Sequence, residues 1–450
     1  MRFSRRILFV GLGSLSLLSC SLKGTSSALS SSVSSPEATS SSLSSVPLFT
    51  DSGIFTDKDY LKASGEHLRN NYGFGDVKTL RGTNIGGYLV IEQWMTAVKG
   101  SSATGYLDHK TVTNLFLQRF GEEKTLDLWA YYRDNYFTDQ DFDTIKALGM
   151  NLIRLPFTYM SLDPAYHNVP QVAGQEFNYS LLDSFIAKAA KRGIYTILDL
   201  HGAYGSQNGQ DYSGESLSRS QVDFYSNEEK MSKTIHLWTS LTEHYKDNPA
   251  IAGFDLLNEP GEKAESTTLR HWAFYDRLND AIRAIDEDRL LIYESCWDGK
   301  NLPSPKLYGW NNCMYSFHNY SGSSDYDENA ASYSAKFTGV EQQGFGVPLY
   351  MGEFNCYGNK ASWIDVLGRL RSKGWNFSSW TYKINLDSPS SYPGWGMVET
   401  FATPVVPDED DEATIKSKWY QIDSAYDGTL PMSFADGTSL KDLMAVYCQN

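Results

Sequence analysis

Short, almost continuously apolar segments alternate with amphipathic segments through most of the chain, which predicts an α/β fold. We interpret the apolar segments as eight strands, the first with a glycine-rich loop at 80–90 and the others at 151–157, 194–200, 251–257, 290–294, 314–318, 348–352 and 375–380. Continuous apolar strands are typical of sheets that are covered on both faces. Between them, apolar residues recur at helical spacing, at 141–148, 179–192, 221–245, 269–285, 363–373 and 440–447.

Eight such units predict a (β/α)8 barrel in a single domain from 47 to 450. The alternative is a doubly wound open sheet, but no Gly-rich phosphate-binding turn follows the first strand. Polar residues lie at the ends of many predicted strands. A doubly wound sheet would gather them at one switch point between two strands, so this distribution favours the barrel. Residues 47–79 are polar and interrupted by Gly73 and Gly75, and we expect them to form an arm over the bottom of the barrel.

The first 20 residues have the pattern of an export signal. Three arginines in the first six residues precede an apolar run from Ile7 to Leu18, which is too short to span a bilayer as a helix. The run ends in Leu-Leu-Ser-Cys at Cys20, which resembles the lipobox of bacterial lipoproteins and implies a lipid on Cys20. A plain signal peptide is the alternative. Residues 21–46 are rich in Ser and predict a flexible tether, so we expect an exported protein, anchored at the cell surface or secreted.

The amino-acid composition disfavours some classes of binding partner and favours others. The formal net charge of −15 disfavours nucleic acid and other polyanions. Aromatic residues make up 14% of the chain, and their rings suit the C–H faces of a neutral sugar. No cysteines lie at metal-ligand spacing, so we expect no zinc site. We also expect that the protein requires no other metal and no organic cofactor. A disulfide and buried free thiols both stay open for the cysteines beyond Cys20: Cys296, Cys313, Cys356 and Cys448.

Two glutamates, Glu259 and Glu353, are the main candidates for chemistry. Each ends a short apolar strand, in the runs GFDLLNEP at 253–260 and VPLYMGEF at 347–354. Pro260 lacks a backbone donor, so strand pairing stops there and leaves Glu259 at the mouth of the predicted barrel. Two carboxyls in this position are the minimum equipment for glycoside hydrolysis, one as the acid and base and the other as the nucleophile.

Other side chains at strand ends are expected to point into the same funnel. Arg154 and Tyr320 would keep the nucleophile ionised by hydrogen bonding. Asn258 would hold the sugar 2-hydroxyl, and Trp380 would form the floor of the pocket. Taken singly, each residue has a structural explanation, such as a buried ion pair for Arg154; their convergence favours a substrate-binding set: Arg154, His201, Asn258, His318, Tyr320 and Trp380.

These motifs resemble glycoside hydrolase family 5, whose members are retaining (β/α)8 glycosidases with an acid/base that follows Asn in an N-E-P run. The resemblance covers about 80–385, and it implies Glu259 as acid/base, Glu353 as nucleophile and 47–450 as the catalytic domain. The segments RGTNIGGYLVIE at 81–92 and HGAYGSQNG at 201–209 are most similar to exo-β-1,3-glucanases of fungal type. That similarity implies that Glu92 binds hydroxyls of the terminal glucose.

The chain departs from that pattern beside the leaving group. After Gly209 those enzymes continue F-D-N-S-G, whereas this chain has Gln210 and Tyr212 in place of the Phe and the Asn. We expect a monomeric, retaining β-glycosidase that acts on β-glucan. Three alternatives stay open: an endo-acting β-1,4-glucanase, a hydrolase of β-1,6-glucan, mannan or a glycolipid headgroup, and a non-catalytic glycan-binding surface lipoprotein.

The segment 385–435 carries two further features. The acidic run at 408–412 predicts a solvated loop, with a calcium site as the alternative. Trp395 would either provide a sugar platform at the rim of the site or pack within its own loop.

Overall fold

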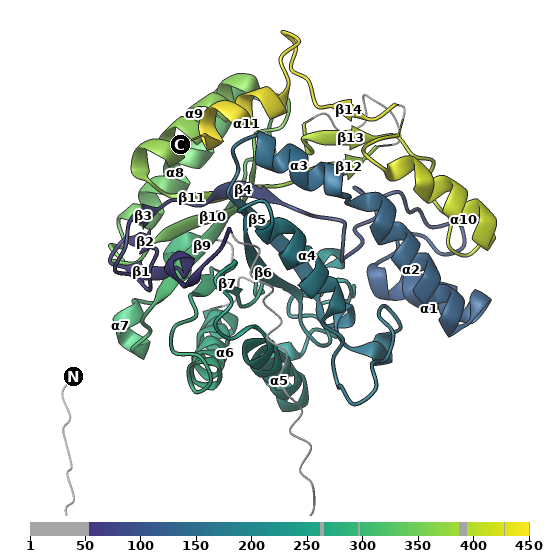
Figure 1. The fold of residues 1–450 in the computed structure, drawn as a ribbon, viewed down its shortest axis with the longest axis horizontal. Helices are drawn as coiled ribbons and strands as arrows, with labels where there is room; N and C mark the ends of the chain where they lie inside the picture. Colours follow the sequence, from purple (N-terminus) through teal and green to yellow (C-terminus); the bar gives the residue numbers. More distant parts are fainter. Residues whose placement is uncertain (1–53, 262–264, 296–297, 387–393, 427, 450) are drawn as a thin grey trace, which may run out of the picture. The chain divides into compact units, whose positions relative to one another are not determined.

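In a computed structural model, which describes residues 54–449 except 262–264, 296–297, 387–393 and 427, eight parallel strands close into a barrel (Figure 1). Each strand pairs with the next along the chain, and the last pairs with the first. The predicted barrel and all eight predicted strands are confirmed. The strands are β4 (Arg81–Asn84), β5 (Leu152–Thr158), β6 (Tyr195–Gly202), β7 (Ile251–Asp255), β8 (Leu291–Glu294), β9 (Cys313–Tyr320), β10 (Leu349–Asn355) and β11 (Asn376–Ser379).

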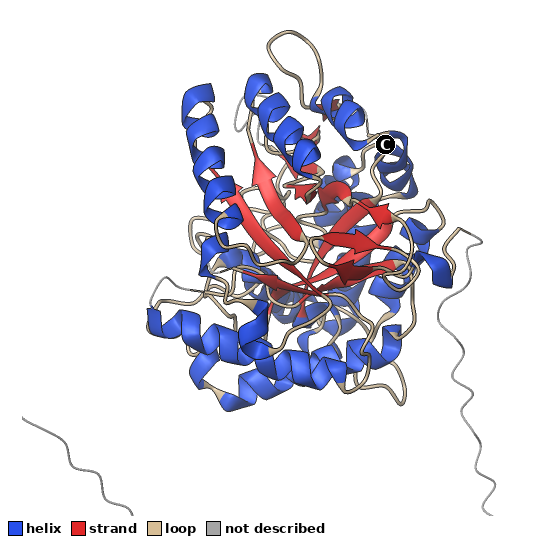
Figure 2. Cartoon of the chain, turned by 90° about the vertical axis from the view of Figure 1, so that its left-hand side faces the viewer, coloured by secondary structure: helices blue, strands red, loops and turns tan. Residues whose placement is uncertain are grey.

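Helices surround these strands, as Figure 2 shows. The barrel strands β5 and β6 are buried at every position, which explains their continuous apolar pattern. The helices around the barrel are α1 (His109–Phe120), α2 (Glu122–Tyr136), α3 (Asp139–Ala147), α4 (Ser180–Ala190), α5 (Glu228–Tyr245), α6 (Glu265–Arg283), α7 (Pro305–Tyr308), α8 (Tyr326–Glu341), α9 (Lys360–Lys373) and α11 (Leu440–Cys448).

One predicted helix begins later than its periodicity suggests. The pattern starts at 221, but α5 begins at Glu228, because the side chain of Asn227 accepts a hydrogen bond from the backbone of Lys230 and caps the helix there. The preceding residues Phe224–Ser226 form a separate 3-10 turn. A local capping interaction therefore sets the boundary.

The segment after the barrel was only partly predicted. It forms a three-stranded sheet of β12 (Lys383–Asn385), β13 (Val398–Thr400) and β14 (Leu430–Pro431), and the helix α10 (Glu412–Trp419). This helix packs against α2, far away in the sequence (Figure 1).

The prediction of a solvated loop at 408–412 was wrong in part. Asp411 caps α10, since its side chain accepts a hydrogen bond from Thr414, and Glu412 is the first residue of that helix. Asp408 accepts a 2.5 Å hydrogen bond from the hydroxyl of Ser101. Acidic side chains stabilise the N-terminal end of a helix, so Asp411 and Glu412 stabilise α10 and are not part of a solvated loop.

The segment before the barrel closes its lower end, as expected for the predicted arm. The strands β1 (Lys62–Ser64), β2 (His67–Arg69) and β3 (Val77–Lys78) form an antiparallel sheet. The backbone of Ala63 donates a 2.9 Å hydrogen bond to Asn312, just before β9, and Tyr195, at the start of β6, donates one to the carbonyl of Asp59. Both contacts lie at amino ends of barrel strands.

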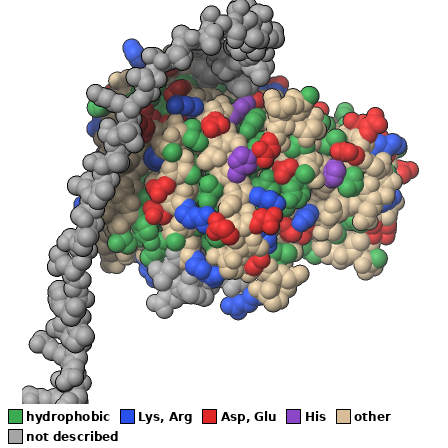
Figure 3. Space-filling model, turned by 90° about the horizontal axis from the view of Figure 1, so that it is seen from below, with side chains coloured by type: hydrophobic (Ala, Val, Ile, Leu, Met, Phe, Trp, Pro, Cys, Tyr) green, Lys and Arg blue, Asp and Glu red, His purple; other side chains and the backbone are tan. Residues whose placement is uncertain are grey.

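The predicted signal peptide with Cys20 and the tether at 21–46 lie outside the described residues, as does Cys296. Within the described part of the chain, no helix is both long and apolar enough to cross a bilayer. Cys313, Cys356 and Cys448 are buried free thiols. On the face drawn in Figure 3, acidic and basic side chains are interspersed rather than gathered by sign.

Candidate active site

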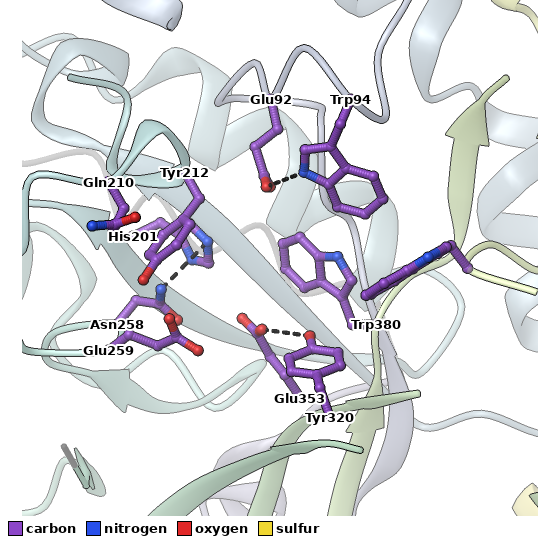
Figure 4. A pocket seen from close by; sticks show the side chains of 11 residues that line it. Glu92, Trp94, His201, Gln210, Tyr212, Asn258, Glu259, Tyr320, Glu353 and Trp380 are labelled. Carbon is purple, nitrogen blue, oxygen red and sulfur yellow. Dashed lines mark hydrogen bonds between the residues drawn. The ribbon is translucent and has the colours of Figure 1, made fainter. Parts of the chain in front are cut away.

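A cavity of about 510 Å³ at the carboxyl ends of the barrel strands collects most of the predicted site residues (Figure 4). Parallel strands place the side chains at their ends around a common funnel. Of the predicted set, only Arg154 and His318 are absent from the lining, and both contact carboxyls that belong to it. The cavity is lined by Glu92, Trp94, His201, Gln210, Tyr212, Asn258, Glu259, Tyr320, Glu353, Trp380 and Trp395.

Arg154, on β5, lies fully buried beneath the cavity and links several strand ends. Its guanidinium donates to Oε1 of Glu353 at 2.7 Å and to Oδ1 of Asn258 at 2.9 Å. It also pairs with Asp255 at 2.9 Å and Asp199 at 3.1 Å. Burial raises the pKa of each aspartate to about 7, although Arg154 opposes this shift. Arg154 is therefore both a buried ion-pair partner and a ligand of a candidate catalytic group.

Glu353 lies on β10 at a point where the pairing with β9 shifts register, between Met351 and Glu353. Such irregularities re-aim side chains near functional sites. The hydroxyl of Tyr320 donates to Oε2 of Glu353 at 2.8 Å, and Arg154 reaches the other oxygen. Donors on both oxygens stabilise the negative charge that a nucleophile needs.

Glu259 sits in a turn held in an uncommon backbone conformation. Its φ angle is 38°, a left-handed value that costs a residue other than glycine about 1 kcal/mol or more. Gln207 donates to the carbonyl of Asn258 at 2.8 Å, and Asn208 donates to the carbonyl of Glu259 at 3.0 Å. Burial raises the pKa of Glu259, against the lowering effect of the Tyr212 hydroxyl, which suits a group that must carry a proton near neutral pH.

His318, on β9, bridges the two candidate carboxyls. Its Nδ1 lies 3.1 Å from Oε1 of Glu259 and 3.5 Å from Oε2 of Glu353, and its Nε2 lies 3.1 Å from Oε1 of Glu294. Burial lowers the pKa of His318 to about 3, so the ring is neutral at ordinary pH. Ligand atoms of Glu259, Glu294 and His318 lie within 4.8 Å of one another, with the imidazole placed between the two carboxyls.

His201 and Trp380 form one wall of the cavity. Their rings stack with centroids 5.5 Å apart and an interplanar angle of 8°. Nδ1 of His201 makes a 2.6 Å hydrogen bond with Asp199, which orients the ring. A Cβ atom at Gly86 would come within 2.8 Å of the Trp380 indole. The glycine in the predicted first loop therefore leaves room for this wall.

Glu92 lies at the end of the cavity opposite the two candidate carboxyls (Figure 4). The indole N–H of Trp94 donates to its Oε2 at 2.8 Å. The other oxygen is buried and has no hydrogen-bond partner among the described residues. Burial, with repulsion from Asp211, raises the pKa of Glu92 well above its usual range. A buried oxygen without a partner is suited to accept a hydroxyl of a ligand.

Several lining residues were not predicted as site residues. Trp94 has no distinguishing sequence pattern. Trp395, whose role the sequence left open, lines the cavity, and its ring lies 4.9 Å from Trp94 and 5.6 Å from Tyr320. Tyr212 points toward Glu259 (Figure 4), and its buried hydroxyl has no well-formed hydrogen bond to any described residue.

Glu294 was missed although it ends a predicted strand. The same strand-end pattern that selected Glu259 and Glu353 also marks Glu294 on β8. It was overlooked because no motif surrounds it. Asp199 and Asp255 were overlooked because they lie inside apolar strands; the register pairs them directly across β6 and β7.

The sequence of this chain matches the family model "Cellulase (glycosyl hydrolase family 5)" over residues 112–385. It is 32% identical over 268 residues to a β-xylosidase of Phanerodontia chrysosporium, covering 58% of this chain and 52% of that protein. It is 28% identical over 284 residues to a probable glucan 1,3-β-glucosidase A of Aspergillus fumigatus, covering 61% and 65%. The chain therefore spans about half to just under two thirds of the length of these relatives.

Two solved structures share the fold. The crystal structure of an endogalactoceramidase has a TM-score of 0.56 at 17% identity, covering 87% of this chain and 84% of that one. A rutinosidase from Aspergillus niger has a TM-score of 0.55 at 14% identity, covering 81% and 99%. At such low identity the likeness concerns the barrel architecture alone.

Proposed function

Because the chain belongs to glycosyl hydrolase family 5, the cellulase family, we propose that it is a retaining β-glycosidase that acts on β-glucan. The observation that carries this proposal is that one nitrogen of His318 lies within 3.5 Å of both Glu259 and Glu353. Carboxyls bridged by a single atom fit the spacing of about 5–5.5 Å used in double displacement better than the wider spacing of inverting enzymes.

In the first step, Glu259 protonates the glycosidic oxygen while Glu353 attacks the anomeric carbon. The bond to the leaving group breaks, the leaving group departs as an alcohol, and a glycosyl ester forms on Glu353. Arg154 and Tyr320 support the nucleophile, since they donate to its two oxygens. The raised pKa of Glu259 favours the protonated form that this step requires.

In the second step, Glu259 is a carboxylate and takes a proton from water, which attacks the anomeric carbon and releases Glu353. Two inversions leave the configuration unchanged. This scheme involves no metal and no organic cofactor. Oδ1 of Asn258 is held by Arg154 and its Nδ2 lies 3.4 Å from Nε2 of His201, which leaves one amide N–H as the donor for the sugar 2-hydroxyl.

The shape of the cavity supports action on a terminal sugar. Glu92 and Trp94 lie at the end remote from the acid/base, where Oε1 of Glu92 has no described hydrogen-bond partner. The rings of Trp94, Trp380 and Trp395 offer stacking surfaces for a pyranose. The names of the glucan 1,3-β-glucosidases among the relatives favour a β-1,3-linked glucan as the substrate.

A second candidate activity is hydrolysis of β-xylosides, which the name of the 32% identical relative favours. The β-1,4- and β-1,6-glucans expected as alternatives differ from a β-1,3-glucan in the aglycone side, which would lie near Gln210 and Tyr212, whereas mannan differs in the reacting sugar itself. Non-catalytic glycan binding is less well supported, because the site retains both carboxyls and their hydrogen-bonding partners.

For the whole protein we also propose export as a monomer and lipid attachment at Cys20, on the sequence pattern alone. Metabolic labelling with a radioactive fatty acid tests the anchor. The label should be present on the wild-type protein and absent from Cys20→Ala. A label that persists in the variant would contradict the assignment of this cysteine.

The activity is tested by offering laminari-, cello- and xylo-oligosaccharides separately and following the first product by NMR. Release of β-glucose from the laminari series is expected. Release of α-glucose would contradict the retaining mechanism, and cleavage of the cello- or xylo-series alone would contradict the proposed linkage or sugar. Glu353→Gln is the matched control, and it should remain folded and inactive.

A further inference from the structure

Glu294, at the end of β8, is a buried carboxyl to which the mechanism above gives no role. It is 1% exposed. The pairing of β8 with β9 sets Glu294 opposite Ser316, two residues before His318. Its Oε1 lies 3.1 Å from Nε2 of His318, on the side of the ring away from Glu259. Glu294 is thus joined to the acid/base through one imidazole.

The charges beneath the cavity are unbalanced. Arg154 faces four carboxyls, and its contacts to Glu353, Asp255 and Asp199 measure 2.7, 2.9 and 3.1 Å. Its contact with Glu294 is longer, at 3.7 Å. Buried carboxyls that lack a close cation favour the neutral form. Glu294 is the least compensated of the four, and it lies against a neutral imidazole nitrogen.

We propose that Glu294 is held as an undissociated acid that donates a hydrogen bond to Nε2 of His318 and so fixes the ring in its Nδ1–H form. In this form Nδ1 is a donor, placed 3.1 Å from Glu259 and 3.5 Å from Glu353. Glu294 is therefore a positioning residue that acts through His318. The inference rests on the proposed function for its catalytic consequence and on the geometry alone for its protonation state.

The arrangement gives each candidate catalytic group a defined role. Since Oε1 of Glu259 accepts from His318, the proton of Glu259 is confined to its other oxygen, which is free to face the glycosidic oxygen. Oε2 of Glu353 lies 3.5 Å from the same nitrogen, so the positive end of the N–H dipole is also close to the nucleophile. Burial and the charge of Asp255 raise the pKa of Glu294 well above its usual range, which agrees with an undissociated side chain. The groups that face it are Arg154, Asp255, Glu259, His318, Glu353, Tyr212 and the hydroxyl of Tyr275, which contacts its backbone.

The tautomer of His318 is the direct test. Nitrogen-15 NMR distinguishes a protonated from an unprotonated ring nitrogen, and the signals of His318 are assigned by their loss in His318→Asn. The proton is expected on Nδ1 in the wild-type protein at neutral pH. A proton on Nε2 would overturn the proposal, because Glu294 would then be an acceptor. This measurement does not depend on turnover, so it can fail independently of the proposed function.

Two substitutions test the catalytic consequence. Glu294→Gln retains a donor, since its amide can donate to Nε2, and kcat should fall by no more than about threefold. Glu294→Met has similar length and no donor, so kcat should fall at least about tenfold while KM changes less than about twofold. Equal losses in both variants, or a wild-type rate in Glu294→Met, would overturn the proposal. Should Glu294→Met fail to fold, the tautomer measurement decides.

Discussion

The hydroxyl of Tyr320 donates a 2.8 Å hydrogen bond to Oε2 of Glu353, and the guanidinium of Arg154 donates to Oε1 of the same carboxylate at 2.7 Å. The two donors come from β9 and β5, which lie on opposite sides of the barrel order. The carboxylate of Glu353 is therefore held by two hydrogen-bond donors that are far apart in the sequence, and each donor can be removed by its own substitution.

Tyr320→Phe removes one donor and keeps the ring. We expect kcat to fall about tenfold or more, because the phenol orients the attacking carboxylate and contacts it throughout the reaction. Thermal unfolding should change little, since the ring still packs near Trp395. Steady-state kinetics with an aryl β-glucoside, beside a melting curve, provide the check. A wild-type kcat would show that Arg154 alone suffices.

Arg154→Met should affect folding as well as catalysis. The substitution leaves Asp199, Asp255 and Glu353 without their shared cation, and breaking such a buried pair costs about 3–5 kcal/mol. We expect a loss of this size in the free energy of unfolding measured with urea. The control is Glu353→Gln, which removes one negative charge from the same cluster and should destabilise far less. Similar stability losses in the two variants would contradict the charge argument.

Tyr212→Phe should shift the pH profile upward. The Tyr212 hydroxyl is the largest of the effects that lower the pKa of Glu259, whereas burial raises it, so removal of the hydroxyl should raise this pKa. An interaction of about 1 kcal/mol between this hydroxyl and the carboxylate corresponds to a little under one pKa unit. Glu259 must be protonated for the first step, so the alkaline limb of kcat/KM should move to higher pH by about half a unit or more. A shift to lower pH would contradict this assignment.

His271 should make the fold sensitive to acid. It is buried on α6, neither ring nitrogen has a hydrogen-bond partner among the described residues, and burial lowers its pKa to about 3. The unfolded chain takes up a proton near pH 6.5, whereas the folded chain does not until near pH 3. The contribution of His271 to the free energy of unfolding is thus fully present above pH 6.5, and it is lost as the pH falls from there toward pH 3. The expected loss between pH 7 and pH 5 is about 2 kcal/mol.

Urea unfolding at pH 7 and pH 5 measures this dependence. In His271→Phe the difference between the two pH values should shrink by about 2 kcal/mol, whatever the stability of the variant at pH 7. His236→Phe, which replaces an exposed histidine of α5, is the control and should retain the full difference. An unchanged pH dependence in His271→Phe would rule out this source of acid sensitivity.

The amino-acid sequence was sufficient to predict the barrel and most of the groups at its mouth. Apolar strands that are buried on both faces leave a continuous pattern, and β5 and β6 show it at every position. A strand in a parallel barrel also has only one end that faces the funnel, so a polar residue at that end, such as Glu259 or Glu353, is placed by the topology alone. For this reason the predicted site residues were brought together.

Tertiary structure alone decided which side chains meet there. The pairing register sets Asp199 beside Asp255, and no local pattern encodes the register between two neighbouring strands. Trp395 reaches the cavity from the segment between β12 and β13, whose path depends on packing against distant residues. The link from Glu294 through His318 to Glu259 joins the ends of three strands. Such contacts depend on distances in space, which periodicity along the chain does not record.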